Sequence, residues 1–151
     1  MKKIVAYFAH PLASDPPGNI EKAKVICRKI AEKYPNITPV SPLLAFSFCR
    51  EPEDRELAMF FCRTLLPKCD ELWMTGDWRK SKGCIEEMTL AISLGMPISE
   101  YKDGKVHHLT EKLRQGWDVV DIKREEENTK LWGVVEVVKQ HIAFCCGYSR
   151  C

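Results

Sequence analysis

Long apolar runs are missing from this 151-residue sequence, and so is an excess of charge of one sign. No stretch approaches the roughly 20 apolar residues that cross a bilayer, and the short run at Lys3–Phe8 is broken at His10-Pro11, unlike a secretion signal. Lys and Arg number 23 against 21 Asp and Glu and are scattered along the chain, whereas a nucleic-acid footprint needs a basic stripe. We therefore expect a cytoplasmic protein with no membrane or nucleic-acid partner.

Cysteine is abundant, with eight residues, but the spacings typical of cysteine sites are missing. The chain has no C-x-x-C pair, and Cys145, Cys146 and Cys151 lack a second ligand pair at zinc spacing. Adjacent His107 and His108 would point to opposite faces of a strand, which makes a poor metal site. We expect reduced structural thiols and neither metal nor cofactor, with a disulfide or metal site near the C-terminus as the alternative.

Apolar segments of strand length alternate with segments of helical period, which predicts an α/β fold. The expected strands cover 3–8, 71–75 and 97–101, with an irregular extended segment at 37–46 and short strands at 106–109 and 119–122. The expected helices start at the N-cap Asn19, at Pro52 and near Gly83. The length fits one domain (1–151), with a core at 3–101 and a C-terminal extension carrying a helix at about 128–145. We predict a doubly wound, Rossmann-like or flavodoxin-like, mostly parallel sheet of four to five strands with helices on both faces.

Ligands of a parallel sheet collect at the carboxyl ends of its strands, so the polar residues there are the candidate site. Those at or after the ends of the first and third strands are Tyr7, His10, Asn19, Asp77, Trp78, Ser81, Lys82, Gly83 and Glu87.

The order of several of these residues resembles the nucleoside 2-deoxyribosyltransferase superfamily over residues 3 to 101. The resemblance rests on Tyr7 in the first strand, Asp70 before the third, the spacing Ser81-x-Gly83-x-x-x-Glu87, Ala91, and a Gly-x-Pro-Ile fourth strand. It implies that Glu87 attacks the sugar C1′ and that Tyr7 orients its carboxylate. The transferases usually carry aspartate where this chain has Ser81. Serine there is similar to the branch that hydrolyses deoxynucleoside 5′-monophosphates, where it accommodates the phosphate.

The chemistry of these residue types agrees with that implication. Cleavage of an N-glycosidic bond passes through an oxocarbenium-like state that a fixed, ionised carboxylate stabilises or traps. We expect Glu87 to stay charged near the positive end of its helix, with Asp77 as a base or sugar contact. The Ser81 hydroxyl and the amides at Gly83, with Lys82, suit a phosphate, and His10, Asn19 and Trp78 complete the expected substrate contacts.

Structural roles for the same residues stay open. Glu87 is also a good helix-stabilising acid, Tyr7 a core aromatic, His10 a turn residue, and Trp78 an oligomer contact.

Two functions follow from the sequence. The first is an enzyme, a nucleotide N-glycosidase or deoxyribosyltransferase acting on a nucleoside or nucleotide. In the transferases that the chain resembles, a C-terminal carboxamide or carboxylate of the neighbouring subunit holds the sugar. The tail 145–151 shows no clear match to this group, which argues against transfer. The second is a binding module that holds a nucleotide or an NAD-derived metabolite without cleaving it. In either case we expect a homo-oligomer, a dimer or larger.

Overall fold

The computed structural model describes residues 1–110. The strand expected at 119–122, the helix at about 128–145 and the three terminal cysteines lie outside the described residues. Along the described chain the elements are β1 (Ile4–Ala9), α1 (Pro16–Lys33), β2 (Ile37–Val40), α2 (Pro42–Ala45), α3 (Arg55–Leu65), the 3-10 turn η1 (Leu66–Lys68), β3 (Glu71–Thr75), η2 (Trp78–Lys80), α4 (Lys82–Ser93), β4 (Ile98–Lys102) and β5 (Lys105–His108). None of the helices within this part is long and apolar enough to span a membrane.

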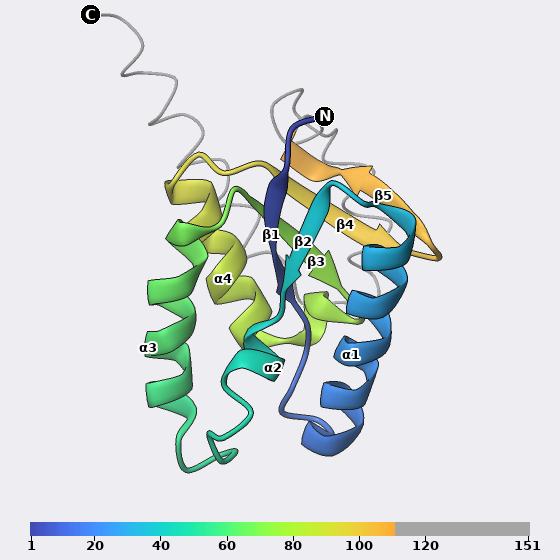
Figure 1. The fold of residues 1–151 in the computed structure, drawn as a ribbon. Helices are drawn as coiled ribbons and strands as arrows, with labels where there is room; N and C mark the ends of the chain where they lie inside the picture. Colours follow the sequence, from blue (N-terminus) through green and yellow to red (C-terminus); the bar gives the residue numbers. More distant parts are fainter. Residues whose placement is uncertain (111–151) are drawn as a thin grey trace, which may run out of the picture.

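The strands form one mixed sheet in the order β2-β1-β3-β4-β5, so the fold is α/β (Figure 1). β1 pairs in parallel with β2 and β3, and β3 pairs in parallel with β4. The last strand, β5, runs antiparallel to β4, after a tight turn at Asp103-Gly104 in which both residues have positive φ. The strand predicted at 71–75 is confirmed, and it lies inside the sheet between β1 and β4, parallel to both.

Apolar side chains alternate along β1 and β3 and supply two cores. Ala6, Phe8 and Trp73 pack with Ile30 of α1, and the Phe8 and Trp73 rings stack at 5.4 Å between centroids. Residues one position away pack instead with α3 and α4; this second core includes Tyr7, Ala9, Leu72, Met74, Cys62, Cys84 and Met88. α1 therefore lies on the opposite side of the sheet from α3 and α4, as Figure 1 shows.

The extended segment expected at 37–46 is wrong in its second half. β2 ends at Val40, and Ser41 then has an extended backbone and precedes the short helix α2, which starts at Pro42. Proline is favoured at the first position of a helix because it needs no hydrogen-bond acceptor there. The chain therefore turns away from the sheet and covers the ends of the strands.

The start of α1 also differs from the prediction. Asp15, not Asn19, is the N-cap, and its carboxylate accepts a hydrogen bond from the Gly18 amide at 3.3 Å. Pro16 and Pro17 occupy the first two helical positions, so the helix begins one turn earlier than expected.

Asp70, one of the residues of the predicted motif, joins the two central strands. Its carboxylate accepts a hydrogen bond from the Val5 amide at 2.8 Å, and its own amide donates to the Val5 carbonyl at 2.8 Å. This pair of bonds sets the register of β3 against β1. The carboxyl ends of both strands consequently open at one edge of the sheet.

Candidate functional site

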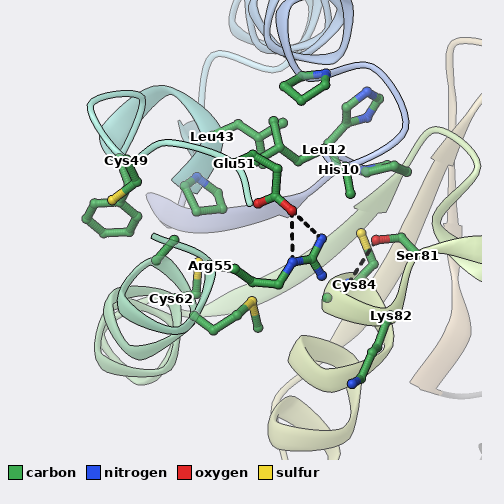
Figure 2. Close-up of a pocket in the computed structure, with 18 of the residues that line it drawn as sticks. His10, Leu12, Leu43, Cys49, Glu51, Arg55, Cys62, Ser81, Lys82 and Cys84 are labelled. Carbon is green, nitrogen blue, oxygen red and sulfur yellow. Dashed lines mark hydrogen bonds and ion pairs between the residues drawn. The ribbon is translucent and has the colours of Figure 1, made fainter. Parts of the chain in front are cut away.

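A pocket of about 480 Å³ opens at the carboxyl ends of β1 and β3 (Figure 2). The chain leaves β1 toward β2 on one side and leaves β3 toward β4 on the other, and ligands of parallel sheets bind where the connections diverge in this way. Four segments supply the wall: the loop after β1 with the start of α1, the stretch from α2 to Glu51, the inner face of α3, and the segment from Asp77 into α4. The volume lies within the usual range for small-molecule sites.

Glu87 is the buried acid of this pocket. It lies in the second turn of α4, only 7% exposed, and its Oε1 accepts a hydrogen bond of 2.5 Å from the hydroxyl of Tyr7. Tyr7 is fully buried in β1, behind the pocket wall. The two residues are 80 positions apart in sequence, and the packing of α4 on β1 brings them together. Tyr7 therefore fixes the orientation of the carboxyl group.

Burial changes the charge expected for Glu87. Removal from water raises the pKa of this carboxyl from 4.5 to about 7, although hydrogen bonds from Tyr7 and from the Cys62 thiol oppose the rise. The expectation of a carboxylate kept ionised by the helix dipole is therefore corrected. Glu87 lies beyond the first turn, where the dipole is weak, and desolvation outweighs it.

Two thiols lie beside this carboxyl. Cys62 of α3 and Cys84 of α4 line the pocket, and burial raises the pKa of Cys62 to about 12 and that of Cys84 further. Both are therefore protonated at neutral pH and are poor nucleophiles. The sequence indicated only a helical apolar position for Cys62, so its contact with Glu87 was not predicted.

The start of α4 lies at the mouth of the pocket. Ser81 is the N-cap, and its hydroxyl oxygen accepts from the Cys84 amide at 3.3 Å while its proton stays available to a ligand. Gly83 faces α3 closely, since a Cβ there would lie 3.6 Å from the Met59 sulfur. Lys82 also lines the pocket, but its ammonium group extends away from the other labelled side chains in Figure 2.

His10 stands at the end of β1 in a defined tautomer. The Thr75 hydroxyl donates its single proton to the Ala9 carbonyl at 2.8 Å, so at 3.0 Å it accepts from Nδ1 of His10. Burial, and then the charge of Lys22, lower the pKa of this histidine, which favours the neutral ring. Its Nε2 is therefore an unprotonated acceptor, and within residues 1–110 it has no hydrogen-bond partner.

Two predicted substrate contacts do not line the pocket. The Asn19 amide donates to the Leu12 carbonyl at 3.1 Å and to the Ser14 hydroxyl at 3.2 Å, so it holds the loop after β1 in shape. Trp78 is buried, and its indole N–H donates to Glu100 at 3.0 Å. Both side chains therefore use these donor groups on partners within the protein.

The predicted residue Asp77 lies at the rim of the pocket. It is exposed and forms an ion pair with Lys80 at 2.8 Å. Of the nine candidate site residues, six line the pocket, namely His10, Asp77, Ser81, Lys82, Gly83 and Glu87, and Tyr7 contacts it through Glu87.

The α2–α3 side of the pocket was not predicted. Leu43, Phe46 and Met59 give it an apolar wall, and the ion pair of Glu51 and Arg55 stands beside them. The sequence marked this region only by prolines and acids at a helix start. Its approach to α4 depends on tertiary packing.

In the comparison with protein families, residues 4–101 match the family described as "Domain of unknown function (DUF7768)". The chain belongs to this family. The matched span runs from β1 into β4 and therefore includes Tyr7, the Ser81–Glu87 segment and the whole described pocket wall. The comparisons with curated proteins and with solved structures found no match.

Proposed function

We propose that this member of the DUF7768 family cleaves, or transfers at, the N-glycosidic bond of a nucleoside, a deoxynucleoside or a nucleoside 5′-monophosphate, with Glu87 as nucleophile. The observation that carries the proposal is the buried Glu87 carboxyl, hydrogen-bonded to Tyr7 and lining a pocket of small-molecule size. The strand order from β2 to β4 adds support, since it agrees with a doubly wound, flavodoxin-like sheet whose ligands bind at this crevice.

In the proposed reaction the Glu87 oxygen not bonded to Tyr7 attacks C1′ of the sugar. The C1′–O bond forms as the C1′–N bond breaks, and the base leaves with the electron pair and takes a proton from water. A water molecule then hydrolyses the glycosyl ester, or a second base attacks it, which gives the hydrolase and transferase outcomes respectively. Tyr7 holds the carboxyl in place through both steps.

The pKa of Glu87 gives a specific reason to keep a second candidate function. With a pKa of about 7, a substantial fraction of Glu87 is protonated at neutral pH, and a neutral carboxyl donates a hydrogen bond instead of attacking. A protein that only binds a nucleotide or an NAD-derived metabolite would tolerate this state.

Chromatography of the reaction mixture separates the two functions. The purified protein is incubated with each common deoxynucleoside and each 5′-monophosphate, and the release of free base is measured. We expect release by the unmodified protein, loss of at least about 100-fold in Glu87→Gln because the nucleophile is absent, and near-normal release in Glu86→Gln, which changes the exposed neighbour. Ligand that binds but is recovered intact would reject the enzyme and favour the binding module.

A further inference from the structure

His10, at the end of β1, has a buried ring nitrogen without a partner. The residue lines the pocket and is 7% exposed, and its Nε2 has no hydrogen-bond partner within residues 1–110. The other ring nitrogen, Nδ1, uses its proton on the Thr75 hydroxyl at 3.0 Å, so Nε2 is an acceptor. A buried acceptor without a donor destabilises a protein. At a pocket wall, such an atom points to a donor on a ligand.

The backbone of β3 holds the His10 ring in one orientation. Gly76 has a positive φ of 64°, and a Cβ there would lie 2.5 Å from Cε1 and 2.8 Å from Nδ1 of His10. Glycine therefore leaves the space that the ring occupies. Because Thr75 and Gly76 contact the Nδ1–Cε1 edge, turning the ring over would break the hydrogen bond to Thr75. The structure thus keeps Nε2, and not Nδ1, as the acceptor for a ligand.

The pocket extends to both faces of the sheet at this end. Ala9 faces the core of α3 and α4, so the next residue, His10, points toward α1. Burial, and then the charge of Lys22 in α1, lower the pKa of His10, which agrees with this direction. In Figure 2 the ring lies beside the loop after β1, apart from Lys82 at the start of α4. Glu87 approaches from α4, so a ligand that fills the pocket lies between Glu87 and His10.

The distance along β1 indicates which part of a nucleoside meets His10. Tyr7, which holds Glu87, and His10 are three residues apart, which is about 10 Å along an extended chain. A sugar ring at Glu87 is shorter than this distance. The departing base lies on the far side of C1′ from the attacking carboxylate. The base, and not the sugar, is therefore the part that extends to His10.

The wall beside His10 selects among the polar groups of a base. The side chains that line the pocket here are apolar, namely those of Pro11, Leu12, Pro16 and Ile20, and the two prolines also lack an N–H. A base carbonyl at this place would meet no donor on these side chains and would face the lone pair of Nε2. An exocyclic amino group would instead donate to it.

We propose that Nε2 of His10 accepts a hydrogen bond from the exocyclic amino group of the base. The pocket then prefers nucleosides of amino-bearing bases, such as adenine and cytosine, over their oxo counterparts with hypoxanthine and uracil. Thr75 is the positioning residue, because its hydroxyl fixes the ring and its tautomer. The inference rests on the proposed function, which puts a nucleoside in the pocket, but binding tests it without any base release.

Calorimetry tests the inference with two matched ligand pairs, deoxyadenosine with deoxyinosine and deoxycytidine with deoxyuridine. In each pair a carbonyl replaces the amino group. The titrations use the unmodified protein and also Glu87→Gln, because this variant does not consume the ligand. We expect the amino member of at least one pair to bind at least about 5-fold more tightly, the effect of giving one buried acceptor its donor.

Two substitutions of His10 separate the roles of its ring nitrogens. In His10→Asn the amide can take the place of Nδ1 and keep the bond to Thr75, but no group stands at the position of Nε2. In His10→Gln the longer side chain places its amide oxygen near that position. We expect His10→Asn to lose the preference for amino-bearing bases and His10→Gln to keep part of it. His107→Asn changes an exposed histidine of β5 and should leave every affinity unchanged.

Thr75→Val keeps the test decisive if His10→Asn folds poorly. It removes the hydroxyl that fixes the tautomer, so the ring stays but the preference should fall.

Equal affinities within both ligand pairs, or a preference that survives in both His10→Asn and Thr75→Val, would overturn the inference. Equal weakening of both members of a pair in His10→Asn would also overturn it, because Nε2 would then contact the sugar. Base release at equal rates from amino and oxo ligands would reject the inference and leave the proposed function standing. A preference that depends on His10, without any base release, would uphold the inference and reject the proposed function.

Discussion

Glu87→Gln should remove most of the pH dependence of stability that the buried carboxyl gives to this fold. The pKa of Glu87 is raised in the folded protein from 4.5 to about 7, so between these values the folded state binds more protons than the unfolded chain. The free energy of unfolding must then fall as the pH rises through this window. The stabilisation that the raised pKa of Glu87 contributes to folding is fully present below about pH 4.5 and is lost above about pH 7.

The size of the effect follows from the shift. At about 1.4 kcal/mol per pH unit, a rise from 4.5 to about 7 corresponds to roughly 3 kcal/mol as an upper limit. Glutamine keeps the shape of the side chain and does not titrate. We therefore expect the unmodified protein to lose roughly 2 to 3 kcal/mol more than Glu87→Gln between pH 5 and pH 8.

Urea denaturation at pH 5, 6, 7 and 8 measures this difference, because the other titrating groups largely cancel between the two proteins. Glu56→Gln, which changes an exposed acid of α3, is the matched control and should follow the unmodified protein. If the unmodified protein and Glu87→Gln lost stability in parallel across this range, the carboxyl would not be desolvated as described, and the reasoning from burial to protonation would fail.

Three other substitutions test single contacts, two at the site and one in the loop after β1. Tyr7→Phe removes the hydrogen bond that lowers the pKa of Glu87, so this pKa should rise. In the same denaturation series, the fall in the free energy of unfolding should then occur at higher pH. Ser81→Ala removes the N-cap of α4 and should lower the free energy of unfolding by about 1 kcal/mol. In calorimetry, the same variant should bind a nucleoside monophosphate more weakly and a nucleoside with nearly unchanged affinity. Asn19→Ala removes two part-buried hydrogen bonds, to the Leu12 carbonyl and the Ser14 hydroxyl, and should lower the free energy of unfolding by about 1 kcal/mol, measurable in thermal unfolding, although the side chain does not line the pocket.

The sequence was sufficient to predict the strands and the helix whose positions depend on a local pattern of residues. Continuous apolar runs located β1 and β3, and the spacing from Ser81 to Glu87 located the start and the inner face of α4. The candidate site residues follow β1 and β3 closely in sequence, and the pocket lies at the ends of these two strands. Most of the predicted site residues therefore line it.

Features that depend on distant partners were not predictable. Trp78 is buried because Glu100, 22 residues later, accepts its indole N–H. The protonation of Glu87 depends on its burial and on its hydrogen bond with Tyr7, 80 residues away. The prediction of a charged Glu87 considered only the dipole of its own helix and included neither effect. The Arg55 side of the pocket exists only because the chain turns at Pro42 and returns α3 to the ends of the strands.

The pH dependence of base release tests the central claim most directly, namely that the buried Glu87 carboxyl attacks the sugar in its ionised form. We expect kcat/KM for a deoxynucleoside 5′-monophosphate to rise about tenfold per pH unit below pH 7 and to level off above it, because only the ionised carboxylate reacts. Glu87→Gln should show no such rise at any pH. Base release that is independent of pH between 5 and 8, or that persists in Glu87→Gln, would contradict the assignment of Glu87 as the nucleophile.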